Sequence, residues 1–191
     1  MLLYKPAYLA RQKQATRLPR AWYLEDAARV HWVRDIKIKA EPNLDKRLLA
    51  GFICRSARVE HGGMSCYDYT IILAGNLSER AERFVAIKEL MHCYFDPDKV
   101  EYATDTAVAL DNHMRQMFDE SGTGKRSLHV QADGMALWMA LGVLCPAHIR
   151  QAYLADGKTA QQVADELNIP VKQAQNLLSD RFDIEISQIL N

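Results

Sequence analysis

Residues 83–95 read RFVAIKELMHCYF, and the rest of the chain is best interpreted outward from this stretch. Apolar residues recur in it at steps of three and four, the spacing of one helix face: Phe84, Ile87, Met91 and Tyr94. Upstream, Asn76 and Glu79 have capping-box spacing, and downstream Asp96-Pro97 stops a helix. We therefore expect a helix up to Phe95 whose apolar face is buried, with three polar residues beside the core: Lys88, Glu89 and His92.

These three polar residues differ by one residue from the H-E-x-x-H signature of zinc proteases. In that signature two histidines one helical turn apart hold Zn²⁺, and the glutamate takes a proton from the metal-bound water. Lys88 stands here in place of the first histidine. A protonated lysine has three donors and no lone pair, so it does not ligate a metal at neutral pH. The string K-E-x-x-H alone also arises by chance on amphipathic helices.

The composition is that of an ordinary globular protein. The chain has 191 residues, of which 49% are hydrophobic and 25% charged, enough to bury a substantial core in one domain with a small appendage. Lys+Arg and Asp+Glu both number 24, so the net charge is zero. No overall electric field therefore favours nucleic acid or a membrane surface as a partner.

The N-terminal residues and the cysteines indicate where in the cell the protein is expected. Residues 1–20 are rich in Lys and Arg, contain no acidic residue, and lack the apolar segment and cleavage site of a secretory signal. We expect a surface helix or a flexible arm there. No run approaches the ~18 apolar residues of a membrane span. A cytoplasmic protein with reduced thiols is expected, since no C-x-x-C pair occurs among the four cysteines: Cys54, Cys66, Cys93 and Cys145.

In the first third of the chain the spacing of apolar residues changes from that of a helix to that of a strand. A helix is expected from about Tyr23 to Asp35, followed by a break near Pro42 and a second apolar segment from Leu48 to Cys54. Gly62-Gly63 then separates short stretches rich in Val, Tyr, Thr and Ile. This pattern predicts a β-hairpin.

The remainder reads as helical. Residues 99–119 fit a helix and residues 120–126 a loop, whose SGTGK lacks the first glycine and the hydroxyl residue of a phosphate loop. Residues 127–155 are expected to form a strongly apolar helix with Pro146 near its end and a further helix after it. Residues 158–190 have the spacing of apolar residues that is typical of a helix-turn-helix. The expected fold class is α+β, mostly helical with a small β-sheet and a C-terminal helix pair.

Four segments together resemble the ImmA/IrrE family of metallopeptidases: Ile71-Ile72 with Asn76-Leu77, residues 82–92, residues 129–146 and residues 164–170. That family has a strand entering an R-R-F-T-x-A-H-E-x-x-H helix, a later E-x-x-A-N/D-x-F-A-x-x-L-L-x-P helix with the third ligand, and a short helix pair. Order and spacing match over roughly residues 60–178. The resemblance implies a zincin-like domain over residues 1–155, with 1–20 as a basic arm, and helix-turn-helix-like helices over 156–191.

Several positions match the family's motifs. Glu89 matches the general base and His92 the second zinc histidine. Other positions match residues of the family that take no part in the reaction. In the first helix these are the Arg-Phe pair and a small residue: Arg83, Phe84 and Ala86. In the second helix they are two small residues, an acidic residue and the proline that ends the helix: Ala132, Ala136, Asp133 and Pro146. Two departures fall on ligands. Lys88 replaces the first zinc histidine, and His129 replaces the glutamate that would be the third ligand.

Two arrangements of the site stay open. His92 and His129 could hold zinc with a recruited third group, for which the candidates are His113, Cys93 and Asp133. Alternatively, the ammonium of Lys88 fills the volume of the cation and offsets the charge of Glu89. A lysine offers no open coordination position and cannot lower the pKa of a bound water to about 7. We therefore expect neither a zinc cofactor nor peptidase chemistry.

Three functions are compatible with these observations. The one we expect is a regulator that recognises a protein partner without cutting it, and the resemblance implies a helix-turn-helix repressor of a mobile element, a phage or a stress regulon. The first alternative is an active metal-dependent endopeptidase with a rearranged site. The second is a DNA-binding regulator whose recognition helix runs from Val171 to Phe182, where Asp180 and Asp183 oppose side chains that suit DNA: Lys172, Gln173, Gln175, Asn176 and Arg181. We expect instead that this helix pair completes the domain core.

Overall fold

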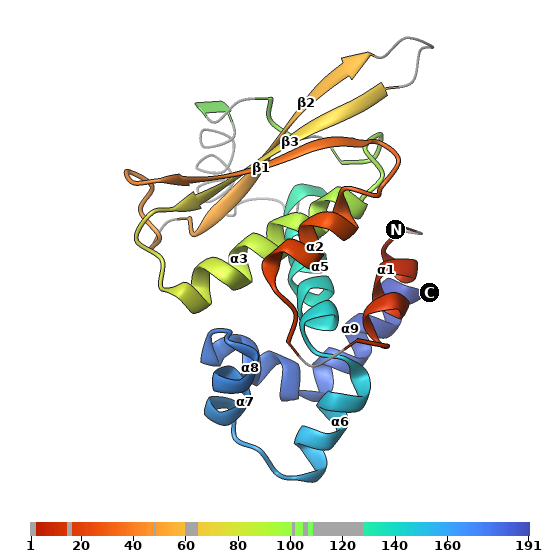
Figure 1. Cartoon of the computed structure of the whole chain (residues 1–191), viewed down its shortest axis with the longest axis vertical. Coiled ribbons are helices and arrows are strands. Elements are labelled where there is room, and N and C mark those ends of the chain that lie inside the picture. Colours follow the sequence, from red (N-terminus) through yellow and green to blue (C-terminus); the bar gives the residue numbers. More distant parts are fainter. Residues whose placement is uncertain are drawn as a thin grey trace, which may run out of the picture.

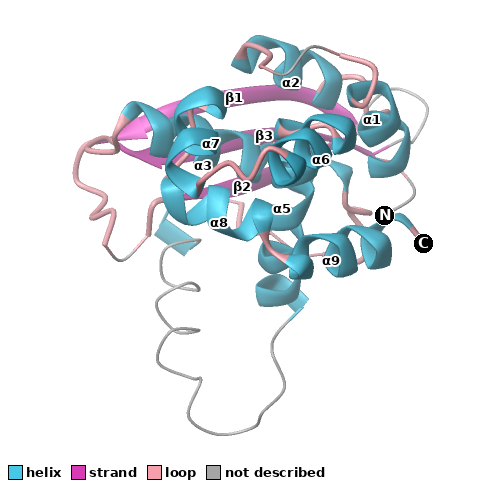
Figure 2. Ribbon diagram, turned by 90° about the horizontal axis from the view of Figure 1, so that it is seen from below, coloured by secondary structure: helices cyan, strands magenta, loops and turns pink. Residues whose placement is uncertain are grey.

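A small β-sheet lies against a layer of helices, and a further group of helices extends that layer away from the sheet (Figure 1). The computed structural model describes residues 3–14, 17–47, 49–59, 65–100, 102–104, 107–108 and 128–191, without the side chains of Val59 and of residues 128–130. Seen from the helical side, the strands lie behind the helices (Figure 2). The fold class is α+β with a small sheet, as predicted.

The sheet has three strands in the described residues, in the order β1-β3-β2: β1 (Val33–Glu41), β2 (Gly51–Val59) and β3 (Ser65–Ala74). β1 runs parallel to β3, and β2 runs antiparallel to β3, from Gly51 opposite Leu73 to Val59 opposite Ser65. The predicted hairpin is confirmed by this pairing, although its turn at Gly62-Gly63 lies outside the described residues.

The helix predicted from Tyr23 to Asp35 is wrong in its second half. α2 covers Arg20–Ala27, and Val33 already belongs to β1. Along β1 the residues alternate, so that Ile36 and Ile38 pack on the main core while the charged neighbours between them face away. Parallel pairing with β3 outweighs the helical propensity of this segment.

α3 (Glu79–Met91) is the predicted central helix and packs on the sheet. Its N-cap is Ser78, whose hydroxyl accepts a hydrogen bond from the amide of Ala81 at 3.4 Å, rather than Asn76. The helix tightens after Met91 into a 3-10 turn, η1 (His92–Tyr94), before the Asp96-Pro97 break. Residues on its buried face meet the inward residues of β3: Phe84, Ile87, Leu90, Tyr69, Ile71 and Leu73.

α5 (Leu128–Leu144) is the central helix of the second half and packs against α3. As predicted, the apolar segment stops at Pro146, and α6 (Ala147–Ala155) follows after a bend of 79°. Within the described residues, no single helix is both long and apolar enough to cross a membrane; only the bent pair of α5 with α6 would pass by length and composition.

The N-terminal segment is a helix, one of the two predicted alternatives, but one of its faces is buried. α1 (Tyr4–Arg11) packs against α5, and the side chains of Tyr4 and Arg11 are completely buried. The hydroxyl of Tyr4 donates to the carbonyl of Met139 at 2.8 Å. Gly142 permits this approach, because a Cβ there would lie 2.7 Å from the Tyr4 hydroxyl. The apolar spacing of α1 therefore decides its place more than its basic residues do.

The C-terminal part contains three helices, not two: α7 (Ala160–Leu167), α8 (Val171–Leu178) and α9 (Asp180–Leu190). The continuous helix predicted from Val171 to Phe182 is broken at Ser179, whose backbone is extended. The expectation that these helices complete the core is confirmed, because one apolar cluster continues from α5 into them: Val163, Leu167, Leu177, Phe182 and Ile186. The helix predicted over 99–119 is wrong at its start, because residues 99–100 and 102–104 are not helical; most of its remainder and the loop predicted over 120–126 lie outside the described residues.

Candidate functional site

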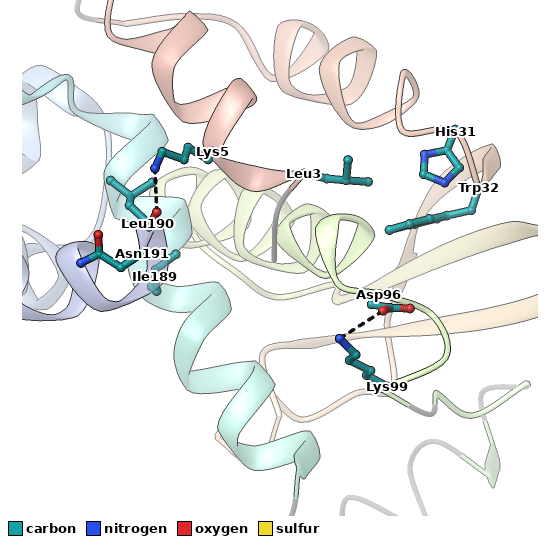
Figure 3. Close-up of a pocket in the computed structure, with 9 residues that line it drawn as sticks. All are labelled: Leu3, Lys5, His31, Trp32, Asp96, Lys99, Ile189, Leu190 and Asn191. Carbon is teal, nitrogen blue, oxygen red and sulfur yellow. Dashed lines mark hydrogen bonds and ion pairs between the residues drawn. The ribbon is translucent and has the colours of Figure 1, made fainter.

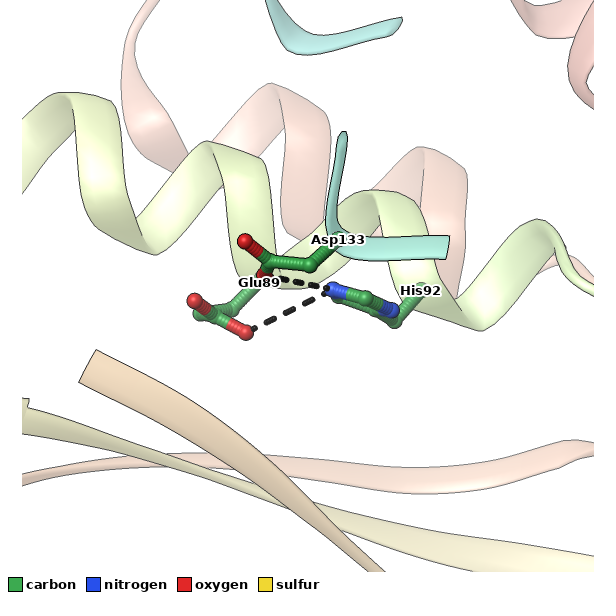
Figure 4. Close-up of side chains that lie close together, drawn as sticks. All are labelled: Glu89, His92 and Asp133. Carbon is green, nitrogen blue, oxygen red and sulfur yellow. Dashed lines mark ion pairs between the residues drawn. The ribbon is translucent and has the colours of Figure 1, made fainter. Parts of the chain in front are cut away.

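α3 and α5 bring three potential metal-ligating side chains together. Glu89 and His92 lie one turn apart on α3 and η1, and Asp133 reaches them from α5 (Figure 4). The Nε2 atom of His92 lies 3.7 Å from Oε2 of Glu89 and 3.6 Å from Oδ1 of Asp133. One ligand atom from each residue lies within 4.8 Å of the others. These groups form a compact polar cluster between two core helices.

The cluster is mostly closed to solvent. The side chains of Glu89 and His92 are 2% and 1% exposed, whereas that of Asp133 is 48% exposed. Burying a carboxylate without a compensating charge costs several kcal/mol, on the order of 3 or more. Glu89 therefore requires a cationic neighbour.

Lys88 supplies that cation. Its Nζ atom lies 3.0 Å from Oε1 of Glu89 and also contacts Oδ1 of Asp133, and its side chain is 14% exposed. Burial by itself would lower the pKa of Lys88, but the charges of Glu89 and Asp133 raise it well above its ordinary value. Lys88 is thus a cation at every physiological pH.

The pKa of Asp133 is shifted in the opposite direction to that of Lys88. Burial would raise the pKa of its carboxyl, but the polar contact with His92 and the charge of Lys88 hold that pKa far below its usual range. The carboxylate is half-exposed, so solvent screens part of this effect. Asp133 is therefore an anion wherever the protein is folded at neutral pH.

The ring of His92 is held from its other side. Its Nδ1 atom lies 2.7 Å from the hydroxyl of Tyr102, which leaves Nε2 turned toward Glu89 and Asp133. The guanidinium of Arg55 lies over the rings of Tyr102 and Tyr67, at 5.2 and 4.5 Å from their centres. A histidine whose second nitrogen is fixed by a hydrogen bond is the usual arrangement around metal-binding imidazoles.

Glu89 retains unused acceptor capacity. Oε1 is buried and has no hydrogen-bond partner in the described part of the chain beyond its ion pair with the Lys88 ammonium at 3.0 Å. A buried polar atom without a hydrogen bond is uncommon in native proteins and calls for an explanation. This oxygen therefore depends on the Lys88 ammonium to offset its burial.

The comparisons with known proteins are negative. No family model matches this chain, and no match was found among curated proteins or solved structures.

The predicted site residues fall into three groups. Lys88, Glu89, His92 and the candidate third group Asp133 meet in the structure. Cys93 is buried beside them but is not part of the ligand cluster among the described residues, and burial raises the pKa of its thiol well above the ordinary value. The side chains of His129 and His113 lie outside the described residues.

Two residues that orient the site were not predicted from the sequence. Tyr102 and Arg55 lie on a connecting segment and on β2, far in the chain from α3. No motif marks either of them, since their role depends on how residues 102–104 lie beside β2, where the amide of Arg55 donates to the carbonyl of Ala103 at 3.0 Å. Only the fold reveals them.

A separate cavity of about 410 Å³ lies where the two ends of the described chain approach each other (Figure 3). Its lining includes Lys5, Lys99 and the aromatic ring of Trp32. Lys5 donates to the carbonyl of Leu190 at 3.1 Å, and Lys99 pairs with Asp96 at 3.5 Å. Both ammonium groups already have acceptors, so a ligand in this cavity would have to compete for them. The cluster around Lys88 is therefore the stronger candidate for a functional site.

Proposed function

We propose that this chain is a regulator built on a degenerate, zincin-like metallopeptidase fold of the ImmA/IrrE type, which recognises a protein partner such as a helix-turn-helix repressor and leaves it intact. The observation that carries the proposal is the position of the Lys88 ammonium, in contact with the carboxylates of both Glu89 and Asp133. A tethered cation thus stands beside the residues that would have to hold a catalytic metal.

The chemistry of an ammonium group supports the absence of cleavage. Zinc peptidases need a metal with an open position that binds and acidifies a water molecule. An ammonium has no such position, and its donors here are directed to carboxylates. A zinc ion added to this arrangement would meet the positive charge of Lys88, so the residues do not fit the metal that the fold type implies.

The accessibility of the general-base position points the same way. Glu89 matches the base of the resembling family, yet its side chain is only 2% exposed, and its Oε1 is buried. A general base must come within about 3 Å of the water or substrate proton that it removes. The site therefore supports recognition of a partner better than hydrolysis.

Direct DNA binding has less support. α8 carries a single basic residue, Lys172, and the nearby Arg181 on α9 pairs with Glu185 at 2.9 Å. On α7, Asp165 pairs with Arg80 of α3 at 2.7 Å, which ties the helix to the domain. Phosphate contacts require several unpaired basic groups on one surface. Any binding that did not weaken with added salt would further count against this function.

The proposal is tested with purified chain and the repressor encoded nearest to its gene. We expect the two to co-elute in size-exclusion chromatography, and the repressor to keep its full mass after prolonged incubation. A repressor that is cut, with cutting abolished by Glu89→Gln, would establish the endopeptidase instead. Lack of association with that repressor and with other helix-turn-helix repressors of the same genome would reject the proposed class of partner.

The endopeptidase remains a second candidate because Glu89, His92 and Asp133 converge within 4.8 Å. It predicts about one zinc ion per chain in protein purified without a histidine tag, measured by elemental mass spectrometry. Purified wild-type chain without bound zinc and without zinc-dependent cleavage would exclude it.

A further inference from the structure

We propose that Glu89, His92 and Asp133 form a cation site whose resident cation is the Lys88 ammonium, and that shortening Lys88 converts the same three groups into a site for Zn²⁺. The proposal concerns the site alone and holds whatever partner the chain recognises. Among the described residues, the ligand from α5 is Asp133.

The separations are close to those of a zinc site. Ligand atoms at about 2.1 Å from a tetrahedral zinc ion are about 3.4 Å apart. His92 Nε2 already lies 3.7 and 3.6 Å from the nearest oxygens of Glu89 and Asp133. Small rotations of the carboxylates would complete the geometry, and a fourth position would remain for water.

The buried oxygen of Glu89 is a second, independent observation. Glu89 is 1% exposed, and its Oε1 has no hydrogen-bond partner in the described residues. Among the described residues, the cation that this atom meets is the Lys88 ammonium, 3.0 Å away. A metal ion in place of the ammonium would meet Glu89 through this oxygen or through Oε2, the oxygen that faces His92.

The imidazole ring of His92 is oriented so that Nε2 could bind a metal. The hydrogen bond between Nδ1 of His92 and the hydroxyl of Tyr102, at 2.7 Å, fixes the ring with Nε2 toward the two carboxylates. Loss of such a supporting bond typically weakens metal affinity about 10- to 100-fold. Tyr102 is therefore a positioning residue of the proposed site.

The experiment compares zinc binding to wild-type chain, Lys88→Ala and Lys88→Gln, all without a histidine tag. Elemental mass spectrometry after dialysis should give about one zinc per Lys88→Ala chain and none for wild type. Zinc at 100 times its Kd should raise the Tm of Lys88→Ala by about 5 to 10 °C, and leave that of wild type unchanged.

Two further variants test which groups hold the metal. Adding His92→Ala to Lys88→Ala should abolish zinc uptake, and adding Tyr102→Phe should weaken it about tenfold or more. Uptake that survives His92→Ala would place the metal elsewhere and overturn the assignment.

Other outcomes also decide the proposal. Wild-type chain that binds zinc as tightly as Lys88→Ala would show that Lys88 does not occupy the site. Lys88→Ala and Lys88→Gln that fold but take up no zinc would show that the three groups are not a metal site. If Lys88→Ala does not fold alone, folding on addition of Zn²⁺, followed by circular dichroism, supports the proposal. Failure to fold with zinc, together with a zinc-free Lys88→Gln, rejects it. None of these results depends on whether a repressor is bound or cut.

Discussion

The Nζ atom of Lys88 lies 3.0 Å from Oε1 of Glu89, and the two side chains are 14% and 2% exposed. The same ammonium contacts Asp133 of α5, so one lysine joins acidic groups from two helices. Charges removed from water in this way depend on each other: the pair adds little to stability as a whole, but loss of one partner leaves the other uncompensated.

Lys88→Met should therefore destabilise the protein by about 3 kcal/mol, because the buried carboxyl group of Glu89 would lose its cationic partner. Urea unfolding with an unchanged slope measures this loss. Lys99→Met is the matched control, since its ammonium pairs with Asp96 at 3.5 Å while 78% exposed, and it should cost less than about 1 kcal/mol. Equal losses in the two variants would mean that the Lys88 pair is no more than a surface ion pair.

The double variant Lys88→Met with Glu89→Gln separates the charge effect from the packing effect. Removing both charges should recover a large part of the loss, because no uncompensated anion remains. A double variant as unstable as the sum of the single variants would show that packing of the lysine side chain, and not its charge, is what matters.

The ion pairs of Lys88 and Asp133 should make stability insensitive to pH over a wide range. The pKa of Lys88 is raised, so its contribution is fully present below the ordinary value of 10.5 and is lost only above it. The pKa of Asp133 is lowered, so its contribution is present above the ordinary value of 3.8 and is lost as the pH falls below it.

The stability difference between wild type and Asp133→Asn should accordingly be constant from about pH 5 to about pH 9 and shrink below about pH 4. Urea unfolding at a series of pH values measures it. A difference that grows on acidification would have the wrong sign for a carboxyl group whose folded-state pKa is depressed.

The sequence is sufficient for α3 and its polar residues because their relation is local. Residues one and four apart on a helix have fixed directions once the apolar face is known, so Lys88, Glu89 and His92 follow from the spacing. Asp133 is 45 residues away from Lys88, and the sequence offered it only as one of several candidates. Contacts between distant segments depend on packing that spacing does not encode.

Two predictions for the first part of the chain differ from the structure. The helix predicted to end at Asp35 runs into the first residues of β1, where Ile36 and Ile38 alternate with charged residues, and a surface helix or flexible arm was expected where α1 buries Tyr4, Tyr8 and Arg11, which recur at helical spacing. The buried guanidinium of Arg11, which donates to the carbonyl of Leu144 at 3.3 Å, shows why a basic residue need not mark a surface.

Gly142→Ala should destabilise the protein by about 1 to 3 kcal/mol, since a Cβ there would lie 2.7 Å from the Tyr4 hydroxyl and 2.9 Å from Cδ1 of Ile186. Gly134→Ala, in the same helix, has nothing within 4 Å of the new Cβ and should stabilise it by about 0.5 to 1 kcal/mol. Thermal unfolding of both variants measures the contrast. Two stabilised variants would mean that α1 and α9 do not pack on α5 as described.

Arg150 holds the junction between α8 and α9, where the predicted recognition helix is interrupted. Its guanidinium donates to the carbonyls of Leu177 at 2.6 Å and Ser179 at 3.1 Å and to Asp183 at 2.9 Å. An ammonium cannot span three acceptors in this planar arrangement, so Arg150→Lys should cost about 2 kcal/mol.

Arg150→Lys should also loosen the structure locally, around the junction of α8 and α9. Amide hydrogen exchange should accelerate most in α8 and α9, because the carbonyls at their junction lose their donors. Arg181→Lys is the matched control: its side chain is 69% exposed and pairs only with Glu185 among the ion pairs described, so we expect a change below about 0.5 kcal/mol. If Arg150→Lys were as mild as this control, the break at Ser179 would be fixed by the extended backbone of that residue and by apolar packing of Phe182, and not by the guanidinium.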